Sequence, residues 1–583
     1  MNIKTVMVFL LLLWSVSVAQ ELVISGEQAS TVHFKLEQNI TIPDGLKEIS
    51  VSFVEPVAFH SPTFSQKIQK LEFAFNPNPD LEENRTDDSG NIIREFIWKY
   101  PAIDLFVSTF LEAVTRVELD SIKSTSPFPV SLSSENLIPY LEETDLVQAD
   151  HPEILKQSTE LVSGCNTQME AVRSILHFVV ELLHYTLVPE KFDALTALRS
   201  GKGNCQNYSH LSAALLRAAG IPVRIINGIT FKKDYIIPVG ESEYSFEMAD
   251  GRHSWIEVYF PDTGWLPFDP QQSEYFVSSR YLRIETGRDN DFTIHDGLVK
   301  WTGSGGSGGS PPALEEIISS EFVADRVLLK NTRKIAGLKR LLLTPPVLTR
   351  ASEQPVIPPY YVPTKPGEFP TPPDSLSPEK SKIDFTRLDY DKPFEYGNLE
   401  FPEKFDFLAA TIADVSTGKA TGEIRRNFIV ETAEYVTGKK RFAQVFILDQ
   451  PIRLETISAA LHFFGGSGLL WLELSEDSDG KPSSEVVTSA RVITERIPVQ
   501  KGYDWISFDF SREGLILSPG RYWISLEFSG SPIVNWFYTY GKPVGPVDGT
   551  RSTSPPEFNW NTIQTYEFNY RVKGKEASDP GDN

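Results

Sequence analysis

The stretch GKGNCQNYSHLSAALLRAAGIPVR, residues 201–224, contains one of only two cysteines in a chain of 583 residues. Two glycines lie just before this cysteine, Cys205, and a run rich in alanine and leucine follows it. Asn204 is a favourable N-cap, and the Gly-Ile-Pro sequence at 220–222 is typical of a helix end. The sequence therefore predicts a helix that begins at Cys205.

A cysteine at this position has a functional and a structural interpretation. The positive end of a helix lowers the pKa of a thiol, which makes the sulfur a better nucleophile. Alternatively, Cys205 is a small buried residue, or it forms a disulfide with Cys165. Closing that loop of about 40 residues would contribute about 4 kcal/mol in the chain-entropy model. We interpret Cys165 as structural and leave a redox pairing with Cys205 open.

Length and composition limit the possible classes of protein. A chain of 583 residues is too long for one hydrophobic core and predicts three or four domains. With 40% apolar and 23% charged residues, a globular protein is expected. The formal charge of −23 argues against nonspecific binding to nucleic acid, which requires an excess of lysine and arginine.

The first residues have the pattern of an export signal. Residues 1–19 combine one lysine, an apolar run and a small residue at Ala19, as in a secretory signal peptide. After signal removal, no stretch reaches the ~18 apolar residues of a membrane span, so we expect no transmembrane segment. The predicted location is secreted, periplasmic or at the cell surface.

Changes in hydrophobic pattern divide the rest of the chain into four parts. Residues 20–145 alternate apolar and polar positions between turns, which predicts an N-terminal β-sandwich. Residues 146–300 have helical spacing first and strand-like runs afterwards, which predicts an α+β unit. Residues 301–383 are rich in Gly, Ser and Pro and are expected to be a linker region. Residues 384–583 predict a C-terminal β-sandwich that resembles a jelly roll.

Some local structures remain open within this scheme. The first helix of the α+β unit is expected to begin after Asn166 or Thr167, either of which can act as the N-cap. The basic, apolar segment 325–345 has the pattern of either a strand pair or one helix.

A nucleophilic thiol also needs a base, and His253 has the most suggestive position among nine histidines. It begins a strand-like run, and Asp269 ends the next one. If Tyr259 pairs with Trp265 around an odd-numbered loop, His253 and Asp269 lie on one face of the sheet, one diagonal step apart. A carboxylate there can orient the imidazole.

At this point the sequence resembles the transglutaminase-like superfamily. The resemblance covers residues 160–275, and it rests on motifs that occur in the family's order: Gly203-Asn204-Cys205, "AAGIPVR" at 218–224, His253-Ser254-Trp255-Ile256-Glu257-Val258, Gly264-Trp265 and Asp269-Pro270. It implies a papain-like core, with Cys205 as nucleophile, His253 as base and Asp269 as the residue that orients the base. It also implies a thioester formed from a glutamine-like or peptide-like acyl donor.

The sequence departs from the animal enzymes of this superfamily. They have Gly-Gln-Cys-Trp at the nucleophile, whereas this chain has Gly-Asn-Cys-Gln. We also find no acidic cluster that matches a calcium site, and we expect no metal and no cofactor. The side-chain partner that completes the oxyanion hole is not assigned from sequence.

The resulting hypothesis is an exported acyl-transfer enzyme that acts on protein or peptide amides through a thioester at Cys205. One alternative is a cysteine peptidase or amidase with the same fold. Another is a noncatalytic surface-binding or adhesion protein. The expected partners are a protein or peptide substrate and, through the C-terminal domain, a glycan or cell-surface ligand.

Other polar and aromatic residues have simpler explanations. We interpret His177 and His184 as packing or surface residues, and His210 is poorly placed to act as a base for Cys205. The Asp-Gly pattern at 477–480 predicts a hairpin turn more strongly than a cation site. We expect the aromatic residues of the last domain to be core residues rather than a sugar-stacking surface: Trp505, Trp523, Trp536, Tyr538, Tyr540 and Trp560.

Overall fold

The computed structural model of the chain describes residues 20–119, 122–131, 134–239, 242–247, 250–271, 277–303, 311–336, 343–344, 347–349, 352–355, 385–399, 401–405, 410–413, 421–426, 430–499, 502–539 and 550–577. The signal peptide expected at 1–19 and most of the proline-rich part of the linker region lie outside these residues. No helix in the described ranges has the length and apolar character needed to cross a bilayer.

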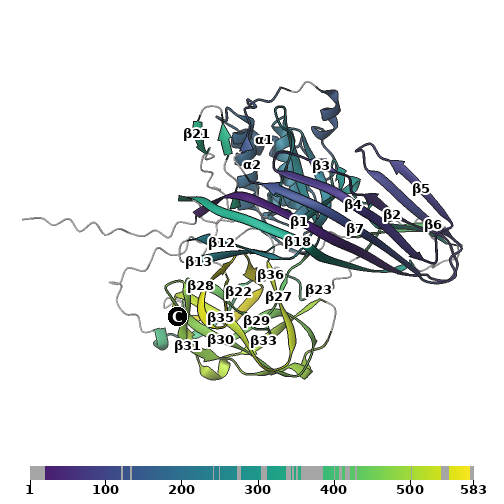
Figure 1. The fold of residues 1–583 in the computed structure, drawn as a ribbon. Helices are drawn as coiled ribbons and strands as arrows, with labels where there is room; N and C mark the ends of the chain where they lie inside the picture. The colour runs from purple at the N-terminus through teal and green to yellow at the C-terminus, as the bar shows by residue number, and fades with distance from the viewer. Residues whose placement is uncertain are drawn as a thin grey trace, which may run out of the picture.

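Two sheets, antiparallel except for the pairing of the short β19 with β1, pack around one apolar core and form what we call the N-terminal sheet pair (Figure 1). Alternating residues of each strand, such as Phe34, Val51 and Phe96, meet in this core because successive side chains of a strand point to opposite faces. The first sheet contains β18 (Ala313–Ala336), β1 (Gln20–Thr41), β7 (Leu105–Glu118), β4 (Phe64–Asn76) and β3 (Phe59–His60), with β19 (Leu343–Thr344) beside β1. The second contains β24 (Ala410–Ala413), β25 (Thr421–Arg426), β17 (Leu298–Gly303), β2 (Leu46–Glu55), β6 (Ile92–Lys99) and β5 (Leu81–Thr86).

The N-terminal sheet pair therefore recruits strands from beyond the range 20–145 that its sequence pattern suggested. β18 pairs with β1 along the whole length of β1, although it lies in the segment 301–383 that we expected to be a linker. The first part of the undecided segment 325–345 is thus strand. β24 and β25 come from the expected C-terminal domain, yet they extend the second sheet next to β17. A long strand such as β18 can pair there because an unpaired sheet edge exposes backbone donors and acceptors.

Four helices form a layer on the core sheet, and the last of them is central. α4 (Cys205–Ala218) packs against the other helices on one side and against β11 and β14 of the core sheet on the other. The other helices are α1 (Pro152–Leu161), α2 (Gln168–Leu182) and α3 (Ala194–Ser200). The start of α2 is capped by Thr167, whose capping box with Glu170 decides between the two predicted caps.

The core sheet has the order β15-β14-β11-β16 and is antiparallel throughout. In the hairpin β14–β15, Tyr259 lies opposite Trp265, as predicted from the odd-numbered loop. The bounds of the strands are β11 (Val223–Thr230), β14 (Asp250–Phe260), β15 (Gly264–Phe268) and β16 (Tyr281–Gly287).

Two further sheets form the C-terminal sheet pair, which lies below the core in Figure 1. The first comprises β12 (Asp234–Val239), β13 (Ser242–Glu247), β38 (Glu557–Gln564), β37 (Arg551–Ser554), β28 (Arg441–Leu448), β35 (Gly520–Gly530), β30 (Gly468–Ser478), β31 (Lys481–Thr488) and β32 (Val492–Ile493). The second comprises β22 (Tyr390–Gly397), β40 (Tyr570–Ala577), β29 (Ile452–Gly465), β33 (Tyr503–Asp509), β23 (Lys404–Phe405), β27 (Ala433–Tyr435), β34 (Ile516–Leu517), β36 (Ile533–Thr539) and β39 (Glu567–Phe568).

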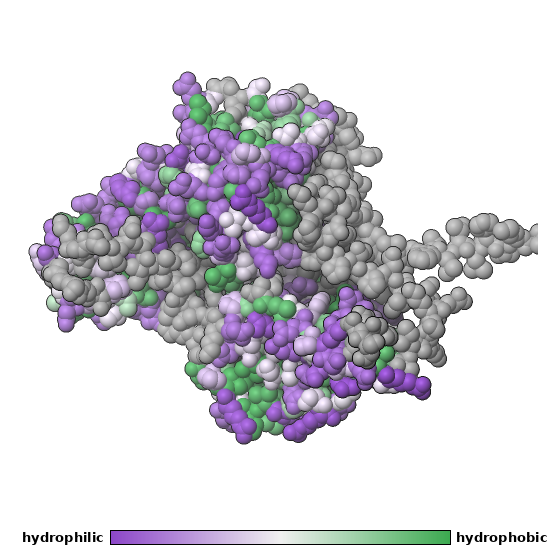
Figure 2. Space-filling model, turned by 180° about the vertical axis from the view of Figure 1, so that it is seen from behind, coloured by the Kyte–Doolittle hydropathy of each residue, from purple (hydrophilic) through white to green (hydrophobic). Residues whose placement is uncertain are grey.

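Strand exchange joins the core to the C-terminal sheet pair. The hairpin β12–β13 leaves the core and pairs with β38. In return, β26 (Val430–Glu431) adds to the beginning of β14. The coloured surface in Figure 2 is largely hydrophilic, with apolar patches that include part of the lower, C-terminal lobe.

One glycine of the core sheet is required by its neighbours. Gly228 on β11 lies opposite His253, and a Cβ at this position would overlap the carbonyl oxygen of Leu282 and the ring of Trp255. Gly228→Ala is therefore expected to lower the free energy of unfolding by about 1–3 kcal/mol, as overpacking does elsewhere. Chemical denaturation measures this change. Gly520→Ala is the control, because a Cβ there meets only ordinary contacts; equal loss in both variants would contradict the packing argument.

Candidate active site

The nucleophile candidate, Cys205, occupies the first turn of α4, as the sequence predicted. Asn204 caps this helix: its Oδ1 accepts the N–H of Gln206 at 3.1 Å, and its own N–H donates to Asn207 Oδ1 at 3.1 Å. The Cys205 side chain is fully buried. Fourteen helical residues therefore direct the positive end of their dipole toward a thiol that is shielded from water.

The base candidate, His253, and the acid candidate, Asp269, contact each other directly. His253 Nε2 lies 2.9 Å from Asp269 Oδ2, and both side chains are completely buried. His253 reaches this position from β14, and Asp269 directly follows β15. The pairing inferred from the loop length thus places both residues on one face of the core sheet.

Two further groups fix the Asp269 carboxylate. The Tyr281 hydroxyl on β16 donates to Oδ2, and the N–H of Gln271 donates to Oδ1 at 3.0 Å. The Tyr281 ring also meets the His253 ring edge-on, with centroids 5.6 Å apart. Tyr281 therefore contacts both members of the pair and helps to hold them in position.

The environment of His253 favours the protonated imidazole. Burial by itself lowers the pKa of the ring, but the charge and hydrogen bond of Asp269 and a hydrogen bond with the Cys205 side chain outweigh it and raise the pKa to about 10. Because Nε2 faces Asp269, Nδ1 is the nitrogen that can exchange a proton with the sulfur. This arrangement of groups favours the imidazolium form of His253 beside the Cys205 sulfur.

Tyr185, which the sequence reasoning did not single out, lies beside the candidate nucleophile. β9 (His184–Tyr185) pairs with β10 (Lys202–Gly203), which leads directly into α4. The pKa of the Tyr185 phenol is raised well above its usual value by burial, by Cys205 and by Tyr208. The phenol therefore stays neutral and can donate a hydrogen bond next to the sulfur.

Neither tyrosine has a signal in the sequence that identifies it. Tyr185 precedes Cys205 by 20 positions, and its proximity depends on the two-residue pairing of β9 with β10. Tyr281 reaches Asp269 from a strand on the far side of β11. Both contacts arise from the tertiary fold rather than from spacing along the chain.

Several of the motif residues form a scaffold next to the candidate site. Glu257 is fully buried between Arg224 and Arg283, with oxygen-to-nitrogen distances of 2.5 and 2.7 Å. Burial raises the pKa of Glu257, but the two arginines overcome this effect and lower it. Arg224 also lies over the Trp265 ring at 4.2 Å. These residues connect β11, β14, β15 and β16.

The remaining candidates from the sequence lie outside this group. Cys165 and Cys205 are both free thiols, so the structure does not contain the disulfide alternative. His210 Nδ1 contacts the carbonyl oxygen of Phe192 at 2.6 Å, and its Nε2 accepts the N–H of Asn290. His177 is buried in α2, and His184 begins β9.

In the C-terminal sheet pair, the Asp477 motif and three of the aromatic residues serve structural roles. Asp477 Oδ2 accepts the N–H of Gly480 in the β30–β31 hairpin, and Oδ1 accepts the Trp523 Nε1–H at 2.7 Å. The side chains of Trp523, Trp536 and Tyr538 are buried. Tyr540 lies outside the described residues.

Comparisons with known proteins point to the same segment of the chain. Residues 156–270 match the model of the family described as the transglutaminase-like superfamily. Over 69 residues, 12% of this chain, the sequence is 41% identical to the uncharacterized protein YebA of Bacillus subtilis. Over 85 residues, 15% of this chain, it is 36% identical to a protein-glutamine gamma-glutamyltransferase of Pseudomonas aeruginosa. These matches span only 9% and 11% of the two relatives.

Among solved structures, the periplasmic domain of TgpA from Pseudomonas aeruginosa aligns with 43% of this chain and 90% of that domain. The alignment has 16% sequence identity and a TM-score of 0.23.

The raised pKa of His253 predicts a pH dependence of stability. The protonated ring stabilises the fold fully below about pH 6.5, the pKa of an unfolded histidine, and this contribution is lost as the pH rises toward about 10. Asp269→Asn removes the main stabilising charge, so its free energy of unfolding should fall less than that of the wild type across this range. Urea denaturation at several pH values measures the difference. Asp44→Asn, at an exposed carboxylate, should keep the wild-type profile; identical profiles for all three proteins would contradict the assignment.

Proposed function

Because residues 156–270 belong to the transglutaminase-like superfamily, we propose that this chain is a cysteine acyltransferase that acts on protein or peptide amides. The observation that carries the proposal is the buried contact between His253 and Asp269 next to a thiol at a helix start. Such a set of groups activates a nucleophile, orients a base and excludes water. The 36% identity to a protein-glutamine gamma-glutamyltransferase supports the choice of a glutamine amide as acyl donor.

In the proposed first half-reaction, Cys205 Sγ attacks the carbonyl carbon of the amide. The carbonyl electron pair moves to oxygen to give a tetrahedral intermediate, and the His253 imidazolium donates its Nδ1 proton to the departing nitrogen. The carbon–nitrogen bond then breaks, ammonia or an amine leaves, and a thioester remains on Cys205. Asp269 keeps the ring oriented through Nε2 throughout this half-reaction.

In the second half-reaction, neutral His253 removes a proton from the acceptor. A primary amine that attacks the thioester carbon gives a new amide and releases the Cys205 sulfur, whereas water gives a carboxylic acid. In this scheme His253 and Asp269 play the same roles whether the acceptor is an amine or water. Transferase and peptidase or amidase activity thus differ in the acceptor that reaches the thioester.

We assign the oxyanion hole to the backbone N–H of Cys205 and the hydroxyl of Tyr185. The N–H belongs to the first turn of α4, where backbone donors lack an intrahelical acceptor. The phenol interacts electrostatically with Cys205 and remains neutral because of its raised pKa. Two donors at the developing negative charge stabilise the tetrahedral intermediate.

The other fine details of the hypothesis are proposals of the same kind. They comprise a papain-like core, flanking β-sandwiches formed by the two sheet pairs, export through a signal peptide, and a glycan or cell-surface ligand for the C-terminal domain. Burial of Trp523 and Trp536 leaves three partly exposed tryptophans in the described part of this domain for sugar stacking: Trp471, Trp505 and Trp560. Arg571 already lies over the Trp505 ring at 4.0 Å.

The catalytic proposal predicts incorporation of a labelled primary amine into a glutamine-rich protein such as casein. Cys205→Ala should abolish incorporation, and His253→Gln should lower kcat by about 10²–10⁴-fold because the proton-transfer group is lost. Mass spectrometry of the product separates amine incorporation from backbone cleavage or simple deamidation.

The control for this experiment is His60→Gln, at an exposed histidine far along the chain from the site. It should keep full activity. Turnover that persists in Cys205→Ala would refute the proposal, and a wild-type protein without amine transfer, cleavage or deamidation would favour the noncatalytic binding protein.

The oxyanion assignment predicts that Tyr185→Phe lowers kcat by about 10²–10³-fold, the usual loss for one donor. KM should change little, because the donor acts on the intermediate rather than on the bound amide. Tyr259→Phe is the matched control on β14. A lower kcat/KM caused only by a higher KM would instead show that Tyr185 binds the substrate.

A further inference from the structure

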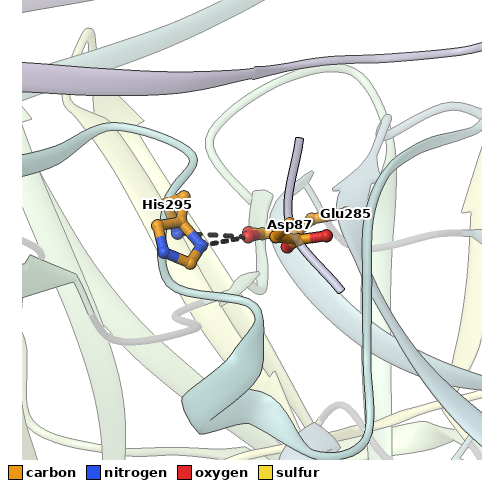
Figure 3. A group of neighbouring side chains, drawn as sticks. All are labelled: Asp87, Glu285 and His295. Atoms are coloured by element: carbon orange, nitrogen blue, oxygen red, sulfur yellow. Dashed lines mark hydrogen bonds and ion pairs between the residues drawn. The ribbon is translucent and has the colours of Figure 1, made fainter. Parts of the chain in front are cut away.

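Three potential ligands for a metal ion meet where the N-terminal sheet pair contacts the core sheet (Figure 3). Asp87 lies in the turn between β5 and β6, Glu285 lies on β16, and His295 lies between a short 3-10 helix (Asn290–Phe292) and β17. One donor atom of each side chain lies within 4.8 Å of the others. None of these residues belongs to the group around Cys205.

Glu285 is the most constrained member of this cluster. Its side chain is fully buried, and Oε1 accepts from His295 Nδ1 at 2.8 Å and from the His295 N–H at 3.3 Å. Oε2 is buried and has no hydrogen-bond partner among the residues that the structure describes. Burial raises the pKa of Glu285, and nearby Asp296 raises it further. A buried carboxylate oxygen without a partner carries a free-energy cost that a cation would remove.

The arginines of the neighbouring strands form ion pairs with other carboxylates. Arg252 binds Asp296 at 2.5 Å and Glu316 at 3.2 Å. Arg283 binds Glu257 at 2.7 Å. None of these ion pairs involves Asp87 or Glu285, the two acidic groups that lie near His295.

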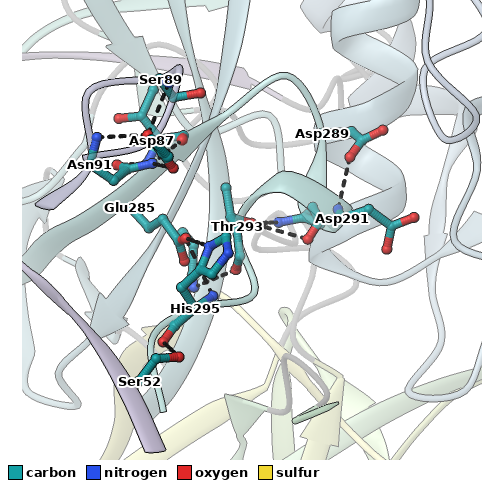
Figure 4. A network of polar contacts seen from close by, with 12 residues as sticks. Ser52, Asp87, Ser89, Asn91, Glu285, Asp289, Asp291, Thr293 and His295 are labelled. Carbon is teal, nitrogen blue, oxygen red and sulfur yellow. Dashed lines mark hydrogen bonds and ion pairs between the residues drawn. The ribbon is translucent and has the colours of Figure 1, made fainter. Parts of the chain in front are cut away.

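Asp87 is held in position by its own turn (Figure 4). Its Oδ1 accepts the N–H groups of Ser89 and Asn91, each at 2.9 Å, and Oδ2 accepts Asn91 Nδ2 at 2.7 Å. Asn91 in turn exchanges hydrogen bonds with the backbone of Thr286, the residue after Glu285. The turn is therefore fastened to β16 beside the buried carboxylate. Asp87 Oδ2 accepts only one of these hydrogen bonds, so it keeps a lone pair for a metal.

A second buried acceptor belongs to the strand next to Glu285. Asn227 on β11 lies opposite Glu285 in the antiparallel register, so the two side chains start close together. Asn227 Nδ2 donates to the carbonyl oxygen of Thr293 at 3.1 Å. Its Oδ1 is buried, and the described part of the chain offers it no hydrogen-bond partner. A water molecule bound to a metal can donate to such an oxygen.

From these observations we propose that Asp87, Glu285 and His295 bind a divalent transition-metal ion, Zn²⁺ or Mn²⁺, with water completing its coordination. One imidazole and two carboxylates suit such ions better than Mg²⁺ or Ca²⁺, which prefer oxygen ligands alone. The imidazole binds through a deprotonated nitrogen, so the His295 Nδ1 proton that now bonds Glu285 leaves if Nδ1 is the ligand. This proposal differs from our sequence-based expectation of no metal. Asp87 lies about 200 positions before the other two ligands, so spacing along the chain did not reveal the cluster.

The bound ion would fasten the β5–β6 turn to β16. This role is structural and independent of the proposed catalysis. Removing the metal is therefore expected to loosen the contact between the N-terminal sheet pair and the core sheet while Cys205, His253 and Asp269 keep their own contacts.

The test is metal binding to chelator-treated protein that carries Cys205→Ala, which removes the buried thiol as a competing Zn²⁺ ligand. Addition of ZnCl₂ or MnCl₂ should raise the melting temperature, whereas MgCl₂ and CaCl₂ at the same concentration should not. Mn²⁺ binding followed by electron paramagnetic resonance should saturate at one ion per chain.

Asp87→Asn should weaken Mn²⁺ binding by at least about tenfold, and Glu285→Gln should do the same. Asp88→Asn, at the exposed neighbouring carboxylate, is the matched control and should bind like the parent protein. Because Asp87 lies in a surface turn, its variant is expected to fold even if Glu285→Gln does not. Equal Mn²⁺ affinity of Asp87→Asn and Asp88→Asn, or equal stabilisation by Ca²⁺, would overturn the proposal.

Discussion

The candidate site depends on one buried hydrogen bond, the 2.9 Å contact between His253 and Asp269. It fixes the direction of the imidazole, and together with Cys205 it raises the pKa of that ring despite complete burial. An isolated charge in such a place would be costly. The charge is tolerated here because a carboxylate, a hydroxyl from Tyr281 and a thiol at a helix start all lie around the ring.

The rest of the core can be understood as the support that keeps these groups together. α4 places the sulfur, the hairpin β14–β15 places the ring and the carboxylate, and β16 supplies the tyrosine that holds the carboxylate. Gly228 allows β11 to pass close to Trp255 and Leu282. Glu257 and its two arginines tie the same strands together without touching the reacting atoms. The motif residues of the superfamily thus divide into the residues proposed to react and the residues that support them.

The sequence was sufficient to predict those structural features that depend on residues close together in the chain. The start of α4 follows from Asn204 and the residues after it, and the register of β14 and β15 follows from the parity of one short loop. The family resemblance then pointed to Cys205, His253 and Asp269, and the structure brings His253 and Asp269 into contact. α1 and α3 were missed because both are short, at ten and seven residues, and their amphipathic pattern extends over too few turns.

Features that depend on long-range pairing could not be predicted. From sequence alone β18 resembles part of a linker, and only its pairing with β1 shows that it is a strand. Division of the chain by its sequence pattern also assigned β24 and β25 to the C-terminal domain, whereas they belong to the N-terminal sheet pair. The same applies to Tyr185, to Tyr281 and to the cluster around Glu285, whose members come from different elements. Periodicity shows that a strand has two faces, but it does not show which strand will lie beside it.

The central claim, that Cys205 forms a thiolate–imidazolium pair with His253, is tested most directly by the pH dependence of its alkylation. Iodoacetamide modification of Cys205, mapped by mass spectrometry, should proceed well below pH 8.5, the usual pKa of a cysteine thiol. In His253→Gln the rate should rise only near or above that pH. Cys165, whose pKa is raised by burial and by Glu170, serves as an internal reference. If Cys205 reacts with the same pH profile in both proteins, the pair does not form and the enzymatic account is contradicted.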